Sequence, residues 1–307
     1  MRENRTFESK ISVRKSGGKK GYDSAWIYIP TRAYSDSSFP FKKEDKLVIE
    51  IEKDKVIARK KRLFDDIIDN YGMENATLPK LIQNKAIENK NMPAILYKEE
   101  VYSYAEVNEN SNRISHGIIK LIKNYDLKKK HIAIMIQNNP YFIWSFVGIA
   151  KAGAISVPVN YFLRGDLLKF IFEHSDSEAL FIDHKFLHLF EEISSDLPQI
   201  KVIVVVNAPK DYAPLEKYLL YEDVNTINKQ NPDVEVKFTD TLEIIFTEGT
   251  TGMPKAIRYK HQKILAGLIY AEDSKEYKRD LKSVYGAPPL FHYFPQFIIL
   301  LQVFFLN

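Results

Sequence analysis

From about residue 77 onward, short apolar runs alternate with segments of helical length, and this alternation restricts the fold more than any other feature of the chain. Runs of strand length occupy residues 131–136, 154–159, 179–182, 202–206 and 242–246. Helices are expected at residues 141–151, 165–174 and 186–193. Strands that are apolar on both faces must be covered on both faces, so the pattern predicts an α/β fold with a parallel sheet between two layers of helices. Pro158 falls within the second run and indicates an edge strand or a strand end.

The first 62 residues show a different pattern and are predicted to form a small all-β module. Strands are expected at residues 25–29, 46–51 and 56–59, the last two as a hairpin. This segment carries 17 Lys and Arg against 9 Asp and Glu, a net charge of +8, whereas residues 63–307 carry 27 against 31, a net charge of −4. The concentration of basic charge predicts a separate partner for the module. Residues 63–76 are expected to be a linker to the α/β part, which covers residues 77–307.

Composition excludes several kinds of chemistry. The chain has no cysteine, so it holds no disulfide, no Cys-ligated zinc and no catalytic thiol. The absence fits a reducing compartment, and we expect a cytoplasmic protein. Residues 1–20 lack the apolar core of a signal peptide, and no apolar run approaches the ~20 residues of a transmembrane helix. Residues 297–306, the longest apolar run, are expected to form a buried helix.

One segment, residues 244–255, has the composition of a phosphate-binding loop. A strand enters a turn with two glycines and three threonines, which Pro254 and Lys255 close. Glycines let backbone N–H groups approach an anion, threonine hydroxyls add donors, and the lysine adds a positive charge. A helix expected from about Lys260 would add its N-terminus. The spacing is not that of a Walker A loop, and an ordinary flexible turn is the alternative. The predicted phosphate-binding residues are Thr247, Glu248, Gly249, Thr250, Thr251, Gly252 and Lys255.

This segment resembles the phosphate-binding loop of the adenylate-forming superfamily, the AMP-binding acyl-CoA synthetases. It differs from the family pattern at Glu248, where serine is usual, and at Ala256, where glycine is usual. Further segments are similar to family elements in the same order, at residues 102–107, 110–112, 137–140, 148–154, 160–165 and 289–292. The form of residues 160–165 is common in the fatty acid transport and very-long-chain acyl-CoA synthetase branch.

The resemblance implies an ATP-dependent acyl-CoA ligase of the long-chain fatty acid type. Such an enzyme activates a fatty acid or another carboxylic acid as an acyl-adenylate and passes it to coenzyme A, so the implied cofactors are ATP, Mg²⁺ and coenzyme A. His292 is implied to lie near the acyl group. No catalytic residue and no metal ligand is assigned within the chain.

The resemblance also bears on completeness. In the family, the adenine-binding segment, the ribose-binding aspartate and the adenylation lysine all lie further along the chain. Residues 77–307 are therefore expected to be an incomplete N-terminal part of the domain, from a truncated or split gene, and inactive alone. A separately encoded C-terminal half is one expected partner.

The order of the expected strands in residues 1–62 resembles that of AbrB-like swapped-hairpin domains. Such domains form interleaved homodimers and often bind DNA, for which the candidate contacts are Arg14, Lys15, Lys19 and Lys20. A solvated basic surface on a dimerisation module is the alternative. A second function is therefore considered for the whole chain, a DNA-binding regulator whose partial AMP-binding domain senses a ligand without turnover.

Overall fold

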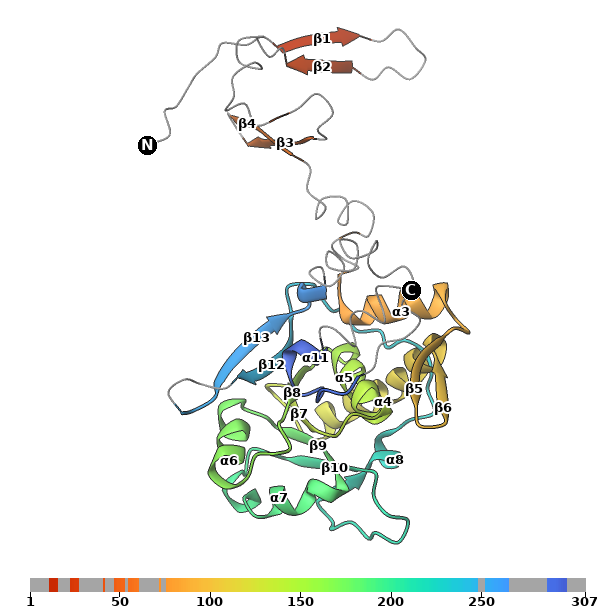
Figure 1. Cartoon of the computed structure of the whole chain (residues 1–307), viewed down its shortest axis with the longest axis vertical. Coiled ribbons are helices and arrows are strands. Elements are labelled where there is room, and N and C mark those ends of the chain that lie inside the picture. Colours follow the sequence, from red (N-terminus) through yellow and green to blue (C-terminus); the bar gives the residue numbers. More distant parts are fainter. Residues whose placement is uncertain are drawn as a thin grey trace. The chain divides into compact units, whose positions relative to one another are not determined.

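The computed structural model describes residues 11–15, 23–27, 41, 47–52, 55–60, 72, 76–247, 252–264 and 286–296. The chain divides into two compact units, Met1–Asp66 and Ile67–Asn307, and each is described by itself (Figure 1). The helix expected over residues 297–306 lies outside the described residues.

The first unit contains two antiparallel strand pairs. Strand β1 (Ile11–Lys15) pairs with β2 (Asp23–Ile27), and β3 (Leu47–Glu52) pairs with β4 (Lys55–Lys60). Only two residues separate Glu52 from Lys55, which are partners across the second pair, so β3 and β4 form the hairpin that the sequence predicts. An AbrB-like fold for this unit stays a prediction.

The second unit is built on a seven-stranded sheet with the order β11-β10-β9-β7-β8-β12-β13. Six of these strands run parallel, as predicted, but β13 pairs antiparallel with β12 at the edge. Pro158 is the last residue of β8, which pairs on both sides, so it marks a strand end and not an edge. The strands are β7 (His131–Met135), β8 (Ile155–Pro158), β9 (Ala179–Asp183), β10 (Val202–Val206), β11 (Tyr218–Leu220), β12 (Thr241–Thr247) and β13 (Lys255–Lys260).

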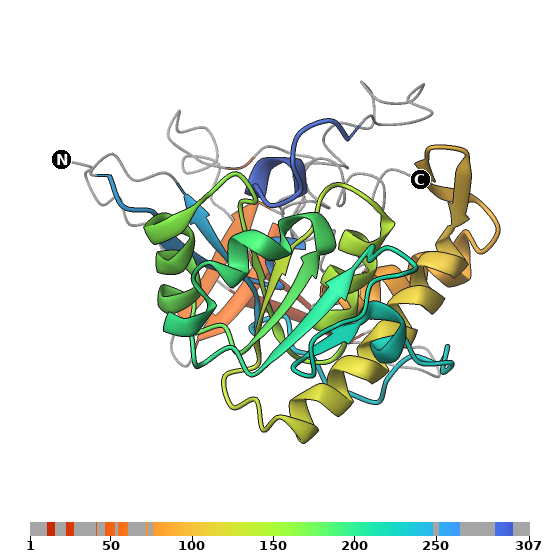
Figure 2. The ribbon, with the colours of Figure 1, turned by 90° about the horizontal axis from the view of Figure 1, so that it is seen from below.

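Helices cover both faces of this sheet, as the sequence predicts (Figure 2). Successive residues of β7 alternate between the two cores, with Ile132 and Ile134 on one face and Ala133 and Met135 on the other. The first face, here called the α5 face, is covered by α3 (Leu78–Glu88), α4 (Tyr104–Asn124), α5 (Pro140–Lys151) and α8 (Tyr221–Val224). The other, the α6 face, is covered by α6 (Gly165–His174) and α7 (Leu187–Glu191), with 3₁₀ turns at His184–Phe186 and Ser194–Asp196.

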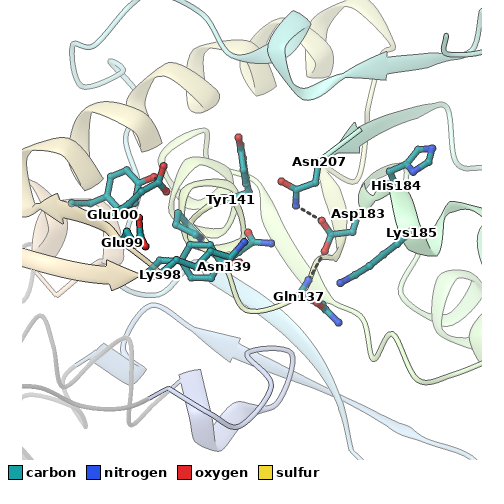
Figure 3. Close-up of a pocket in the computed structure, with 13 residues that line it drawn as sticks. Lys98, Glu99, Glu100, Gln137, Asn139, Tyr141, Asp183, His184, Lys185 and Asn207 are labelled. Carbon is teal, nitrogen blue, oxygen red and sulfur yellow. Dashed lines mark hydrogen bonds between the residues drawn. The ribbon is translucent and has the colours of Figure 1, made fainter. Parts of the chain in front are cut away.

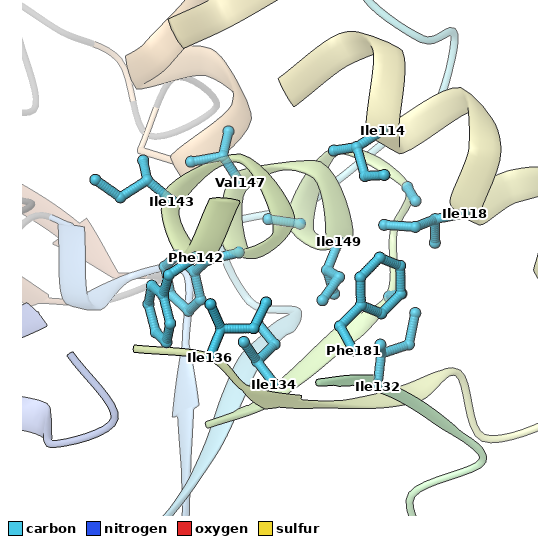
Figure 4. Packing of buried hydrophobic residues seen from close by; sticks show 14 of the residues in the cluster. Ile114, Ile118, Ile132, Ile134, Ile136, Phe142, Ile143, Val147, Ile149 and Phe181 are labelled. Carbon is cyan, nitrogen blue, oxygen red and sulfur yellow. The ribbon is translucent and has the colours of Figure 1, made fainter. Parts of the chain in front are cut away.

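Helix α5 is sandwiched between the sheet and α4. Its side chains meet β7 on one side, and Ile114 and Ile118 of α4 lie on the other (Figure 4). A side chain at Gly148 would lie 2.3 Å from the Cγ2 atom of Ile114. This close approach of the two helices therefore requires glycine at that position.

Lys151, the last residue of α5, is buried in a cage of amide oxygens. Its Nζ atom donates to the Oδ1 atoms of Asn108, Asn112 and Asn231 at 2.6, 2.6 and 2.9 Å. Burial lowers the pKa of Lys151 to about 7. All three ammonium protons are used, so the lysine joins α5 to α4 and to the segment after α8.

A β-hairpin that the sequence did not predict precedes α4. It consists of β5 (Pro93–Tyr97) and β6 (Glu100–Ser103). Ser103 then begins α4 with a capping box, in which its hydroxyl accepts from the Glu106 N–H group and the Glu106 carboxylate accepts from the Ser103 N–H group. Within the described part of the chain, no helix has the length and apolar character needed to cross a membrane.

Candidate functional site

The predicted phosphate loop connects β12 and β13 at the carboxyl edge of the sheet. Thr247 ends β12 and Lys255 begins β13, and the two residues are partners in the strand register. The structure thus places Thr247 and Lys255 at the base of the loop and also describes Gly252. The other predicted phosphate ligands, Glu248, Gly249, Thr250 and Thr251, lie outside the described residues.

The base of the loop is open. Lys255 is exposed, and no described residue forms an ion pair with its ammonium group. Gly252 has a φ of 99°, and a side chain there would meet nothing within 4 Å. Glycine is favoured by this left-handed backbone, which turns the chain back toward Lys255.

One expectation about the loop is wrong. Directly after the loop the chain forms β13, which extends over Lys255–Lys260. A strand of this length carries the chain roughly 17 Å away from the loop. A helix that begins after Lys260 therefore cannot add its N-terminus to the phosphate cradle.

The segment that contains His292 is fixed to the carboxyl end of β7 by Asn138. The Asn138 Nδ2 atom donates to the carbonyl oxygens of Gly286 and Pro288 at 2.9 and 2.8 Å, and its Oδ1 atom accepts from the Leu290 N–H group at 2.8 Å. His292 itself is exposed, and its ring lies 4.4 Å from that of Phe291. The acyl-site role of His292 stays a prediction.

The same segment also contacts β13. The ring of Tyr293, in the short helix α11 (Tyr293–Pro295), stacks on Tyr259 with a centroid distance of 4.4 Å. The ammonium group of Lys263 lies over both rings, at 5.3 and 5.5 Å, and pairs with the buried carboxylate of Glu243 in β12. The structure thereby brings the two predicted elements, the loop hairpin and the His292 segment, together at one edge of the sheet.

A crevice that the sequence did not predict lies at the carboxyl ends of β7, β9 and β10. After β7 the chain enters α5 on the α5 face, whereas after β9 it enters α7 on the α6 face. The two connections diverge, and such switch points are where open α/β sheets bind ligands. This switch-point crevice has a volume of about 770 Å³ and is lined by Tyr97, Lys98, Glu99, Glu100, Tyr102, Gln137, Asn139, Pro140, Tyr141, Asp183, His184, Lys185 and Asn207 (Figure 3).

Asp183 is the central polar group of the switch-point crevice. Its Oδ2 atom accepts from the Gln137 N–H group at 2.8 Å and its Oδ1 atom from the Asn207 amide at 2.5 Å. Burial raises the pKa of Asp183, although these two hydrogen bonds oppose the shift. The available signal in the sequence is that Gln137, Asp183 and Asn207 end or closely follow three apolar runs.

The candidate DNA contacts belong to the first unit. Arg14 and Lys15 lie in β1, paired with Ser24 and Asp23 of β2. Lys19 and Lys20 lie outside the described residues. The role of all four residues stays a prediction.

Comparison with known proteins gives a family match and partial relatives. The family described as AMP-binding enzyme matches residues 82–306. The chain is 28% identical over 212 residues to a medium/long-chain-fatty-acid–CoA/3-oxocholest-4-en-26-oate–CoA ligase of Mycobacterium marinum, covering 65% of this chain and 38% of that protein. Long-chain fatty acid transport protein 6 of Mus musculus is 31% identical over 180 residues, which are 57% of this chain and 28% of that protein.

Solved structures share the fold. A long-chain-fatty-acid-CoA ligase from Archaeoglobus fulgidus superposes with a TM-score of 0.63 at 18% identity, covering 75% of this chain and 45% of that chain. This chain thus spans well under two thirds of the length of each of these proteins.

Proposed function

The chain belongs to the AMP-binding enzyme family, and on that premise we propose that it carries the phosphate-binding part of an ATP-dependent acyl-CoA ligase. The reaction joins a carboxylate to the α-phosphorus of ATP with loss of pyrophosphate, and a thiol then displaces AMP from the acyl-adenylate. The relatives include proteins named as fatty-acid–CoA ligases, and a medium- or long-chain fatty acid with coenzyme A is the substrate pair we propose. A cytoplasmic location is part of the same proposal.

The observation that carries this proposal is the geometry at the base of the loop. Lys255 lies opposite Thr247 in the strand register and is exposed, and a side chain at Gly252 would meet nothing within 4 Å. An ammonium group and a hydroxyl can both bind phosphate oxygens, and they stabilise the charge that develops on the departing pyrophosphate. Lys255 and Thr247 therefore hold the phosphates in place while the carboxylate reacts.

Mg²⁺ and the acyl group are assigned next. Among them, no group of three or more His, Asp or Glu side chains is arranged to hold a metal ion. Mg²⁺ therefore enters the proposal as the ion that accompanies ATP and offsets its charge. We assign the acyl group to the side of His292, where the exposed ring of Phe162 lies 6.2 Å from that of Phe291 and offers an apolar surface.

The decisive experiment measures ATP binding to the full chain by calorimetry. Lys255→Ala is expected to weaken ATP binding by about tenfold, because it removes a charge-assisted hydrogen bond. Lys260→Ala is the matched control, since Lys260 is an exposed lysine at the far end of the same strand. Equal effects of the two substitutions, or no binding of ATP, would contradict the proposal. With a fatty acid added, pyrophosphate release reports the adenylation step, and with coenzyme A also present, formation of the acyl-CoA thioester reports the complete reaction.

Two finer assignments complete the proposal. The first is membership of the fatty acid transport and very-long-chain branch, supported by the 31% identity to the mouse transport protein. The second is an AbrB-like module at residues 1–62 with a linker at 63–76, supported by the two antiparallel strand pairs and the net charge of +8. The family match and the ligase relatives favour the ligase over a ligand-sensing regulator.

The module has its own test. A homodimer in analytical ultracentrifugation, and DNA binding that weakens steeply with salt, are expected if the basic charge contacts phosphates. Arg14→Ala with Lys15→Ala should lower both the affinity and the salt dependence. A monomer that does not shift DNA at low salt would overturn the assignment.

A further inference from the structure

At the floor of the switch-point crevice, some hydrogen-bond acceptors and donors have no partner in the described part of the chain. The two carboxylate oxygens of Asp183 have about four acceptor positions, of which Gln137 and Asn207 fill two. Asn139 uses its Oδ1 atom to cap α5 at Phe142, and its amide nitrogen donates to no residue in the described part of the chain. Asp183 is only 2% exposed. The floor therefore offers acceptors and a donor in a place that is shielded from bulk water.

The wall of the crevice is aromatic and rigid. Tyr102 and Tyr141 both line the cavity, and both contact Trp144 edge-to-face at 5.4 and 5.1 Å. Tyr141 also contacts Tyr221 at 4.9 Å. Tyr97 adds a third ring from the β5–β6 hairpin. Rings supported from behind in this way keep their faces in place for a flat ligand.

The charges of the lining disfavour a phosphate at the floor. Three carboxylates line the crevice, those of Asp183, Glu99 and Glu100, against two lysines, Lys98 and Lys185. Asp183 is the buried member, whereas Lys98, Glu99 and Glu100 are exposed on the hairpin. A ligand without negative charge avoids repulsion from the Asp183 carboxylate.

We propose that the switch-point crevice binds a nucleoside that carries no phosphate group, with its base against the tyrosines and its ribose hydroxyls on the Asp183 carboxylate. A vicinal diol supplies two O–H donors, which matches the two open acceptor positions of Asp183. The volume of about 770 Å³ lies within the ~300–1,000 Å³ typical of small-molecule sites. The assignment thus uses the carboxylate, the amides and the rings together.

This nucleoside site is separate from the phosphate loop. Strands β8 and β12 lie beyond β7 in the sheet order, so β7 and β12 are two strand spacings apart, roughly 10 Å. Nucleoside binding in the crevice consequently does not depend on Lys255, and the failure of either proposal leaves the other standing.

The test is a calorimetric titration of the full chain with adenosine. Asp183→Asn is expected to weaken adenosine binding by about tenfold or more, because it removes a charged acceptor. Tyr97→Ala on the exposed hairpin should also weaken binding, and it keeps the test valid if Asp183→Asn does not fold. The matched control is Leu96→Ala, since Leu96 is 67% exposed, does not line the crevice and lies on the opposite face of β5. Lys255→Ala should leave adenosine binding unchanged.

Three related ligands distinguish the chemistry. 2′-Deoxyadenosine lacks one hydroxyl of the diol and should bind about tenfold more weakly, and AMP should bind no more tightly than adenosine. Glucose, a diol without a flat base, should not bind. The proposal is overturned if adenosine does not bind saturably, if deoxyadenosine binds as well, or if glucose binds with the same dependence on Asp183. It is also overturned if Lys255→Ala abolishes adenosine binding while Asp183→Asn does not.

Discussion

The two ends of strand β9 each carry a buried carboxylate, and the two carboxylates differ in how many hydrogen bonds they accept from the protein. Glu178, directly before the strand, accepts from the backbone N–H groups of Lys128, Lys129 and Lys130 at 3.0, 2.6 and 3.0 Å and from the Lys201 ammonium group at 3.3 Å. Asp183, the last residue of the strand, accepts two hydrogen bonds from the protein. The carboxylate at the amino end of β9 has its acceptor positions filled by the protein. The carboxylate at the carboxyl end faces the switch-point crevice and has two acceptor positions open.

The difference is visible in the pKa values. Burial alone would raise the pKa of Glu178, but the backbone N–H groups of residues 128–130 and Lys201 outweigh it, so its pKa is lowered. For Asp183 the effect of burial is larger than the opposing effect of its hydrogen bonds, so its pKa is raised. A carboxylate whose acceptors are filled by its own chain stabilises the fold, and one whose acceptors are half empty is available to a ligand.

The largest expected effect on stability comes from removing the Glu178 carboxylate at the amino end of β9. Glu178→Ala leaves three backbone N–H groups and Lys201 without their acceptor, and we expect the free energy of unfolding to fall by about 3 kcal/mol. Chemical denaturation measures it. Glu173→Ala is the control, because the Glu173 carboxylate is half-exposed and 3.9 Å from Lys169, a contact worth at most ~0.5 kcal/mol. Equal denaturation midpoints for Glu178→Ala and Glu173→Ala would contradict a large contribution of the Glu178 carboxylate to stability.

The isosteric amides sharpen the comparison. Glu178→Gln should cost about 2 kcal/mol, since an NH₂ group would then face backbone N–H donors that cannot turn away. Asp183→Asn should cost less than about 1 kcal/mol, because the Asn207 amide can flip to offer its oxygen and a buried charge is lost. The same denaturation series measures both. A larger cost at Asp183 than at Glu178 would reverse the assignment of the two ends.

Lowering the pH should change the contributions of Glu178 and Asp183 to the free energy of unfolding in opposite directions. With its lowered pKa, Glu178 contributes stability above the ordinary pKa of a glutamate, and this contribution is lost as the pH falls through the folded-state value. Asp183, with its raised pKa, costs stability at neutral pH, and the cost disappears as the pH falls through its folded-state value. The stability gap between wild type and Glu178→Gln should therefore close in acid. A gap that stays constant down to the acid transition would count against the hydrogen bonds of Glu178.

The smallest effect is expected for the lysine at the amino end. Lys201 is partly exposed and shares its ammonium group between Glu178 and the carbonyl oxygen of Asp126. Lys201→Ala should lower the free energy of unfolding by only about 0.5 kcal/mol. A loss as large as that of Glu178→Ala would show that the ion pair, and not the backbone N–H groups, carries the contribution of Glu178.

The central strands could be predicted from the sequence because burial on both faces leaves a continuous apolar run. Strand β13 had no such signal, since most of its residues are exposed and three of them are Lys255, Arg258 and Lys260. The β5–β6 hairpin was missed for a related reason, because Leu96 and Val101 are exposed partners in it. The helix predicted at residues 186–193 is present as α7, Leu187–Glu191, which is shorter than expected and follows a 3₁₀ turn at His184–Phe186.

The candidate site was predictable only where its residues are adjacent in the sequence. Thr247 and Lys255 belong to one loop with a recognisable spacing. Asp183 is a single acidic residue at the end of an apolar run, and its meaning arises only when the sheet order places it beside Gln137 and Asn207. The local pattern places each of these three residues at or just after the end of an apolar run, but it does not give the order of the strands in the sheet, which decides that the three ends are neighbours.

The tether made by Asn138 has a consequence for the order in which the molecule assembles. Its three hydrogen-bond partners lie 148 to 152 residues further along the chain, so the ribosome must add all of these residues after Asn138 before that amide is satisfied. The entropic cost of closing so long a loop grows only with the logarithm of its length. The sheet can therefore form first with this edge uncovered, and the segment that carries His292 docks afterwards as a late folding step.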